Sequence, residues 1–280
     1  MKKGKILFTG GNGFIGRQIV PFLIEDGWEV IRPRSTQVRL EVLDEVETLF
    51  NNGQHYDAII HGAIVGGRRD VDDDAKVFYT NMSMFETLFR YIDQTNMFIN
   101  FDSGASYGRP ALVECPGPEN FGQVIPKDYY GMSKYCIAKR VLDNPKSINL
   151  RIFGCFGQHE ESTRFFSTNI KNYINKEDIV ITKNRKIDFI YSDDLYKIIK
   201  YYLDGNDGPK DINCVYPEKY NLNDIAKIIN NLDKHSVSIK KEGQYNEFSY
   251  CGKSNSLPIK YDGLKKGIKD VYEYFCQRNI

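Results

Sequence analysis

The sequence contains no long hydrophobic run. No apolar stretch among its 280 residues approaches the roughly 18 to 20 residues that a membrane helix needs. The basic residues 1–5 are followed by only three apolar residues, Ile6, Leu7 and Phe8, before glycines interrupt the chain, and a signal peptide needs a longer apolar core. We therefore expect a cytoplasmic protein without a membrane partner.

An excess of charge of one sign is also missing. Lys and Arg total 38 and Asp and Glu total 37, so the formal net charge is +1. This balance excludes a globally basic nucleic-acid binder and an acidic, self-repelling tail protein. Because 41% of the residues are hydrophobic and 13% are aromatic, the chain has ample material for a buried core.

Cysteine spacing gives no sign of a metal site or of a disulfide framework. No two cysteines form a CxxC pair, so we expect reduced, mostly structural thiols and no bound metal. The acidic run at 70–74 is interpreted as a solvated loop. The six cysteines are Cys115, Cys136, Cys155, Cys214, Cys251 and Cys276.

Short apolar runs alternate with longer periodic segments in the first half of the chain, which is typical of βαβ units. Strands are expected at 5–9, 29–32, 58–61, 98–102 and 149–153, and helices at 14–26, 42–51, 75–94 and 130–142. The predicted fold class is α/β, with a Rossmann-type doubly wound parallel sheet covered on both faces.

The alternation loosens beyond residue 157. Helices are expected there at 168–175, 193–203 and 223–231, and strands at 179–181 and 212–215. We therefore predict a dinucleotide-binding domain over 1–157, to which 187–214 return, and a smaller mixed α/β substrate lobe over 158–280.

A glycine-rich turn follows the first predicted strand and precedes the first predicted helix. Gly10, Gly13 and Gly16 have the spacing GxxGxxG. Glycine allows a sharp strand-to-helix turn, and its missing side chain lets a pyrophosphate approach the helix N-terminus. This position favours a dinucleotide site over a turn without a ligand, and the candidate contacts in it are Gly10, Asn12, Gly13, Phe14, Ile15 and Gly16.

The end of the second predicted strand bears on the choice between the two nicotinamide cofactors. An acidic residue there would bind the ribose of NAD, whereas Arg favours the 2′-phosphate of NADP. The sequence has Arg32, Arg34 and Ser35 at this place and no carboxylate. We therefore favour NADP (NADPH) over NAD; the alternative is that both arginines are solvated loop charges.

Tyr130 and Lys134 have a YxxxK spacing near the start of a predicted helix, where residues i and i+4 share a face. An ammonium near a phenol lowers the pKa of the phenol toward the range of a general acid or base. Ser103 directly follows the fourth predicted strand, at the edge where doubly wound sheets bind ligands. Ser103 is thus expected to hold a carbonyl oxygen that Tyr130 protonates, with Ser106 as a competing candidate.

The segments 9–16, 103–108 and 130–134, in this order and spacing, resemble the extended short-chain dehydrogenase/reductase family, especially its nucleotide-sugar epimerases, dehydratases and 4-ketoreductases. Further similarity lies at 61–63, 151–157 and 188–194. The resemblance implies a catalytic set of Ser103, Tyr130 and Lys134. It also implies cofactor contacts from Gly62, Ala63, Asn81, Tyr130 and Lys134, and substrate contacts from Ser103, Gly104, Ala105 and Tyr130.

Departures from the family patterns favour one of its reactions. The fucose-synthase branch has a Cys two residues after the catalytic Ser and a later His, whereas this chain has Ala105 and no His in 161–168. Dehydratases have an Asp-Glu pair where this chain has Gly104 and Ala105. What remains is NADPH-dependent reduction of the C4 keto group of a nucleotide-diphosphate 4-keto-(6-deoxy) sugar, in the biosynthesis of a surface-polysaccharide sugar. A nucleotide-sugar epimerase with retained NAD(P) and a non-enzymatic NADP-sensing protein are the alternatives.

The resemblance also bears on substrate binding and assembly, and leaves the nucleotide and the sugar open. Family members commonly have an Arg where this chain has Ile187, so Arg185 is the candidate to bind the nucleotide. The alternative is that Arg185 belongs to a solvated basic turn without a ligand. A homodimer through the helices at 75–94 and 130–142 is implied. The apolar stripe that fits it equally fits packing on the sheet; its members are Phe78, Met82, Phe85 and Phe89.

Overall fold

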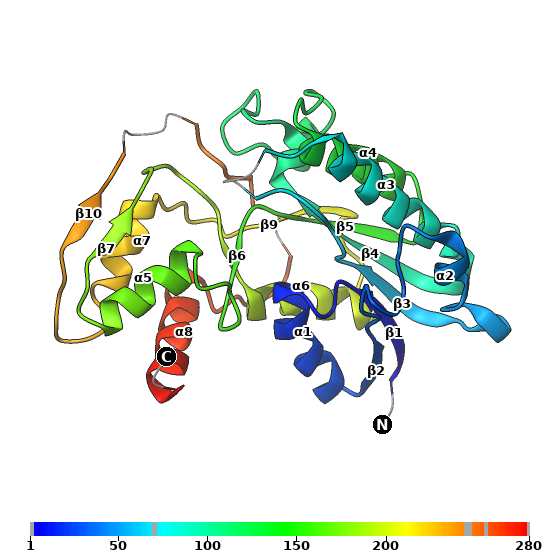
Figure 1. The fold of residues 1–280 in the computed structure, drawn as a ribbon, viewed down its shortest axis with the longest axis horizontal. Coiled ribbons are helices and arrows are strands. Elements are labelled where there is room, and N and C mark those ends of the chain that lie inside the picture. The colour runs from blue at the N-terminus through cyan, green and yellow to red at the C-terminus, as the bar shows by residue number, and fades with distance from the viewer. Residues whose placement is uncertain (1–2, 69–71, 244–247, 255–256, 279–280) are drawn as a thin grey trace.

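The computed structural model describes residues 3–68, 72–243, 248–254 and 257–278. Its centre is a sheet of six parallel strands in the order β2-β1-β3-β4-β5-β9 (Figure 1). These strands are β1 (Gly4–Thr9), β2 (Trp28–Ile31), β3 (Tyr56–His61), β4 (Thr95–Ser103), β5 (Ser147–Ile152) and β9 (Asp211–Cys214). The predicted parallel α/β architecture is confirmed.

Helices cover both faces of this sheet. In Figure 1, α1 (Phe14–Glu25) and α6 (Ser192–Leu203) lie below the strands, and α3 (Ala75–Phe89) and α4 (Tyr129–Leu142) lie above them. The short helix α2 (Leu43–Glu47) contacts α3. Both faces can be apolar at once because successive side chains of a strand point to opposite sides.

The strand sequences show this alternation directly. Ile6 and Phe8 of β1 belong to one buried cluster, whereas Leu7 between them belongs to the other. In β3, Ile60 and Ile59 are divided in the same way. The continuous apolar runs of the sequence therefore fill two cores, one on each side of the sheet.

The second lobe is built from short elements. The strand β6 (Cys155–Phe156) pairs with β8 (Ile190–Tyr191), and β7 (Ile179–Ile181) pairs with β10 (Ile239–Lys241). The helices α5 (Phe165–Ile174), α7 (Leu222–Ile229) and α8 (Leu264–Arg278) surround them at the left of Figure 1. Between these elements the chain returns to the first lobe, where α6 packs on α1 and β9 pairs with β5. No helix in the described ranges is long and apolar enough to cross a membrane.

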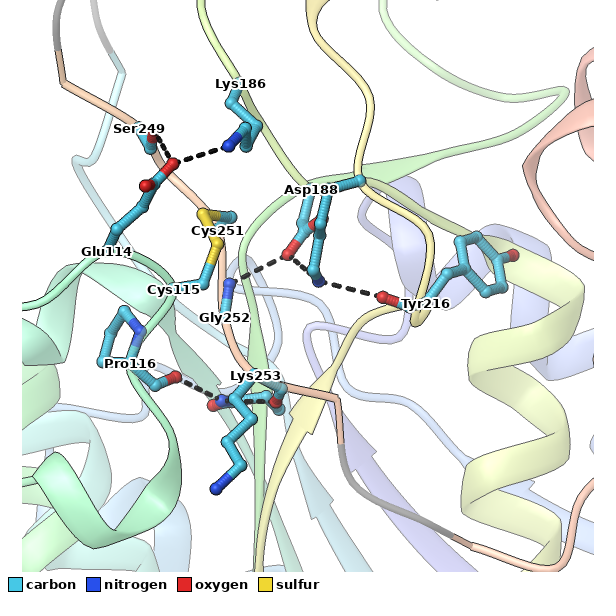
Figure 2. Close-up of a disulfide and its surroundings, with 12 residues drawn as sticks. Glu114, Cys115, Pro116, Lys186, Asp188, Tyr216, Ser249, Cys251, Gly252 and Lys253 are labelled. Atoms are coloured by element: carbon cyan, nitrogen blue, oxygen red, sulfur yellow. Dashed lines mark hydrogen bonds and ion pairs between the residues drawn. A yellow bond between two sulfur atoms is a disulfide. The ribbon is translucent and has the colours of Figure 1, made fainter.

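The expectation that all six cysteine thiols are reduced is wrong for two of them. Cys115 and Cys251 form a disulfide with their Cα atoms 4.5 Å apart (Figure 2). Their sequence separation is 136 residues, so no local spacing pattern reveals the pair. The disulfide joins the loop that follows β4 to the segment 248–254 of the second lobe. Cys136, Cys155, Cys214 and Cys276 are free thiols.

Candidate active site

The order of the strands reverses between β1 and β3, and ligands of doubly wound sheets bind at the carboxyl ends of the strands at such a point. Gly10 has φ +74°, and a Cβ atom on it would lie 2.6 Å from the carbonyl carbon of Gly62 after β3. Only glycine allows the two loops to approach this closely. The predicted contacts Gly62 and Ala63 thus lie beside the glycine-rich turn.

The glycine-rich turn leads directly into the start of α1. Gly13 is the N-cap of α1 and provides no side-chain hydrogen bond, and the first turn holds no acidic residue. The first N–H groups of a helix lack partners within the helix and favour an anion. The Asn12 side chain donates to the Arg32 carbonyl at 3.0 Å and so fastens the turn to the end of β2. The residues present fit the pyrophosphate of a nicotinamide dinucleotide.

The loop after β2 carries the three residues predicted to contact the cofactor ribose. Arg32, Arg34 and Ser35 are all exposed. Within the described ranges, neither guanidinium forms an ion pair with a carboxylate. Both cations therefore remain available to an anionic ligand beside the turn.

Asn81 of α3 holds the loop after β3 in place. Its Oδ1 accepts from the Val65 N–H at 2.9 Å, and its Nδ2 donates to the Val65 carbonyl at 3.0 Å and to Ser133 Oγ of α4 at 3.1 Å. Farther along this loop, a Cβ atom on Gly67 would lie 2.6 Å from the ring of Tyr130. The side chain of Asn81 therefore supports the loop that packs on Tyr130.

Ser103 and Tyr130 come together where β4 ends and α4 begins. Ser103 Oγ accepts from the Ala105 N–H at 3.2 Å and lies 3.1 Å from the phenol oxygen of Tyr250. Burial raises the pKa of Tyr130, and Tyr250 adds to the rise, whereas a hydrogen bond with Ser103 and the charge of Arg109 oppose it. Tyr130 therefore holds its proton at neutral pH.

Ser106, the competing candidate, does not point into this group. It is fully buried in the turn Gly104–Tyr107, and its single proton faces two acceptors, Asp102 Oδ2 at 2.9 Å and the Ser103 carbonyl at 2.8 Å. A hydroxyl committed to these two acceptors is part of the internal network of β4. The geometry thus favours Ser103 over Ser106 as the hydroxyl at the site.

Lys134 lies one turn after Tyr130 on α4, as the YxxxK spacing predicts. Its Nζ donates to the Phe101 carbonyl at 2.6 Å, and burial lowers its pKa to about 8 although Asp102 opposes the shift. The charge of Arg109 opposes the rise in the pKa of Tyr130 that burial causes. The Arg109 guanidinium lies 5.6 Å from the centroid of the Tyr130 ring and 5.7 Å from that of Tyr250.

Arg185 lies at the second-lobe side of the same group. It is half-buried, and burial lowers its pKa, with Arg109 adding to the effect and Tyr250 opposing it. Ile187, which stands where the family pattern has an Arg, is 1% exposed and pairs with Tyr250. Arg185 therefore lies near Tyr250 and Arg109, and Ile187 is a core residue.

Sequence reasoning missed Arg109 and Tyr250. Arg109 directly follows the segment 103–108, and no motif includes it. Tyr250 lies 147 residues after Ser103. Only the contact between the two lobes brings its phenol to Ser103, so no spacing rule could have found it.

The comparisons with known proteins agree with this geometry. A model of the NAD dependent epimerase/dehydratase family matches residues 6–221. A GDP-L-fucose synthase from Azorhizobium caulinodans is 31% identical over 121 residues, 41% of this chain, and the chain spans only 38% of that protein's length. A putative UDP-glucose 4-epimerase from Methanocaldococcus jannaschii is 26% identical over 98% of this chain and 99% of its own.

A solved structure extends the similarity to the whole fold. A GDP-mannoheptose C4 reductase from Campylobacter jejuni with NADP bound superposes with a TM-score of 0.81 over 99% of both chains, at 17% identity. At that identity the superposition establishes the fold and not the substrate. The second lobe is thus part of the shared architecture.

Proposed function

The chain belongs to the NAD dependent epimerase/dehydratase family, and on that premise we propose that it reduces the C4 keto group of a nucleotide-diphosphate 4-keto-(6-deoxy) sugar with NADPH. The product would serve the biosynthesis of a surface-polysaccharide sugar. The observation that carries the proposal is the Ser103–Tyr130 hydroxyl pair at the carboxyl end of the sheet that also carries the glycine-rich turn. Such a pair can protonate a carbonyl oxygen.

The chain's own residues have separate tasks in this reaction. The turn at 10–16 would hold the pyrophosphate, Arg32, Arg34 and Ser35 the 2′-phosphate, and Lys134 the nicotinamide ribose. Bound NADPH supplies the hydride. Ser103 donates a hydrogen bond to the carbonyl oxygen, and Tyr130 transfers its phenol proton to that oxygen. Burial raises the pKa of Tyr130, which keeps the proton available for transfer.

Two structural details speak against 3,5-epimerisation and against dehydration. Ala105 is fully buried and offers only a methyl group where an epimerising branch has a Cys. A side chain at Gly104 would run into the ring of Phe153, so the carboxylate pair of a dehydratase has no space there. His61 is no replacement base, because burial, aided by Lys134, lowers its pKa to about 3.

The test is a substrate panel. Purified full-length protein is given GDP-, CDP-, dTDP- and UDP-4-keto-6-deoxysugars with NADPH, and NADPH absorbance and the sugar products are followed. The proposal expects stoichiometric NADPH loss with at least one member. No loss with any member would reject it. Interconversion of sugars by tightly retained cofactor, without net NADPH loss, would favour an epimerase, the activity in the name of the Methanocaldococcus jannaschii relative.

The cofactor preference has its own test. Replacing Arg34 by Ala removes a guanidinium that would pair with the 2′-phosphate, so the KM for NADPH should rise about 10-fold, the worth of one charge-assisted hydrogen bond. The KM for NADH should hardly change, because NADH lacks that phosphate. Arg90→Ala, an exposed arginine after α3, is the matched control. Equal effects on both cofactors would contradict a 2′-phosphate contact.

The pH dependence of reduction follows from Lys134. Its pKa is lowered to about 8, chiefly by burial, so the ammonium loses its charge as the pH rises through about 8. The kcat/KM for NADPH, which reports groups of the free enzyme, should therefore be flat near pH 7 and fall above pH 8. In Lys134→Arg the charge persists, so this basic limb should move upward. A limb that stays in place would show that another group titrates.

We also propose a homodimer formed by α3 and α4. Phe85 and Phe89 of the predicted stripe are buried against the sheet, whereas Phe78 and Met82 are only half-buried. Tyr79, on the outer side of α3, is 67% exposed. Sedimentation should give the mass of two chains, and Tyr79→Glu should give that of one. A wild-type monomer at micromolar concentration would contradict the proposal.

A further inference from the structure

We propose that Arg109 and Tyr250 are positioning residues that fix the direction of the Ser103 hydroxyl proton, so that it points toward Tyr130 and the substrate oxygen. The inference rests on the proposed function of Ser103. It concerns a hydrogen-bond chain from Arg109 through Tyr250 and Ser103 to Tyr130. Two of its members come from the catalytic motifs and two do not.

Tyr250 is held firmly by its backbone. Its N–H donates to the Lys186 carbonyl at 2.8 Å, and its carbonyl accepts from the Asp188 N–H at 3.0 Å. The next residue, Cys251, is joined to Cys115, and Gly252 donates to the Asp188 carboxylate at 2.8 Å (Figure 2). The segment is therefore fastened on both sides. The phenol of Tyr250 is brought to Ser103 by a fixed support rather than by a long loop.

Arg109 sets the direction of the first hydrogen bond. An arginine side chain carries five N–H donors and no acceptor. Burial acts to lower the pKa of Arg109, but the charges of neighbouring groups and a hydrogen bond with Tyr250 raise it. In that hydrogen bond Arg109 can only donate. The Tyr250 oxygen accepts this bond, and the proposal places its own proton on the line to Ser103 Oγ, 3.1 Å away, where the distance allows either oxygen to donate.

The hydrogen bond from Tyr250 in turn orients the hydroxyl proton of Ser103. A hydroxyl has one proton and accepts at two lone-pair positions. At Ser103 Oγ these positions receive the Ala105 N–H, at 3.2 Å, and the Tyr250 O–H. The Ser103 proton must then point elsewhere, and the hydrogen bond of Ser103 with Tyr130 gives the direction. A substrate carbonyl oxygen that enters between Ser103 and Tyr130 would accept a hydrogen bond from a Ser103 proton that already points toward it.

A direct role of Arg109 in substrate binding is the competing explanation. Arg185 lies near the same phenol, and two guanidiniums could together hold the diphosphate of the substrate. The two explanations differ in how the variants combine. A residue that acts through Tyr250 loses its effect when the phenol oxygen is gone, whereas a residue that binds substrate does not.

The experiment is a double-mutant cycle on the full-length enzyme. Tyr250→Phe and Arg109→Met should each lower kcat about 10-fold, the worth of one hydrogen bond, with the KM for NADPH unchanged. The double variant should have a kcat no lower than that of the slower single variant. The control Tyr220→Phe, which removes another phenol oxygen of the second lobe, should keep the wild-type kcat. Multiplying losses, or a raised sugar KM in Arg109→Met at unchanged kcat, would overturn the proposal.

A second measurement does not depend on turnover. Neutron diffraction from deuterated crystals of the full chain locates hydroxyl protons directly. We expect the Tyr250 deuteron on the line to Ser103 Oγ and the Ser103 deuteron directed toward Tyr130. A Ser103 deuteron directed at Tyr250 would overturn the inference, whether or not the panel yields a substrate. If no keto sugar is reduced, the proposed function fails, but the neutron result still decides the direction of the hydrogen bonds from Arg109 to Tyr130.

Discussion

The Tyr130→Phe variant should reduce the substrate about 100-fold to 10,000-fold more slowly than the wild-type enzyme, the range that a positioned proton donor contributes. The change removes one oxygen atom and leaves the ring between Gly67 and Arg109 in place. Binding of NADPH should therefore be nearly intact. Turnover with the substrate found in the panel and cofactor titration by fluorescence measure the two quantities separately.

The neighbouring residue supplies the control. Tyr129 begins α4 and is 46% exposed, so Tyr129→Phe removes a phenol oxygen from the same turn without touching the site. It should retain wild-type kcat and stability. Unchanged turnover in Tyr130→Phe would remove Tyr130 from the proton-donor role and leave Ser103 as the remaining hydroxyl.

The parts of the site that sequence reasoning could find are those that local chain geometry determines. The strand-to-helix turn at 10–16 requires glycine at fixed positions, and the spacing of Tyr130 and Lys134 follows from one helical turn. The strands were predictable because each is a short apolar run between periodic segments. Each of these features depends only on residues within about 10 positions of one another along the chain. The sequence alone therefore suffices to predict them.

The parts that could not be predicted depend on contacts between distant segments. Tyr250 reaches Ser103, and Cys251 reaches Cys115, only because the second lobe folds back onto the loop after β4. Lys134 shares a face with Tyr130, but burial and the Phe101 carbonyl decide where its ammonium lies. The short strands of the second lobe have the same origin, because strands of two or three residues are specified by their partners rather than by their own pattern.

A buried ion pair behind Ser103 leads to the second large expected effect. Arg151 of β5 is fully buried, with Nε 2.8 Å from Asp102 Oδ2 and Nη1 3.1 Å from Asp211. Its Nη1 also donates to the hydroxyl of Tyr107 at 2.8 Å. The guanidinium thereby joins β4, β5 and β9 through Asp102, the residue before Ser103.

Arg151→Met should lower the free energy of unfolding by about 3 to 5 kcal/mol, because it leaves the Asp102 carboxylate buried without its cation. Urea denaturation measures the loss. Arg68→Met is the matched control: Arg68 pairs with Glu161 at the surface, where the two side chains are 67% and 53% exposed, and an exposed pair contributes at most about 1 kcal/mol. Adding Asp102→Asn to Arg151→Met should recover part of the loss, since the unpaired charge is then gone. Equal losses in the two arginine variants, or no recovery, would show that packing of the long side chain and not its charge stabilises this end of the sheet.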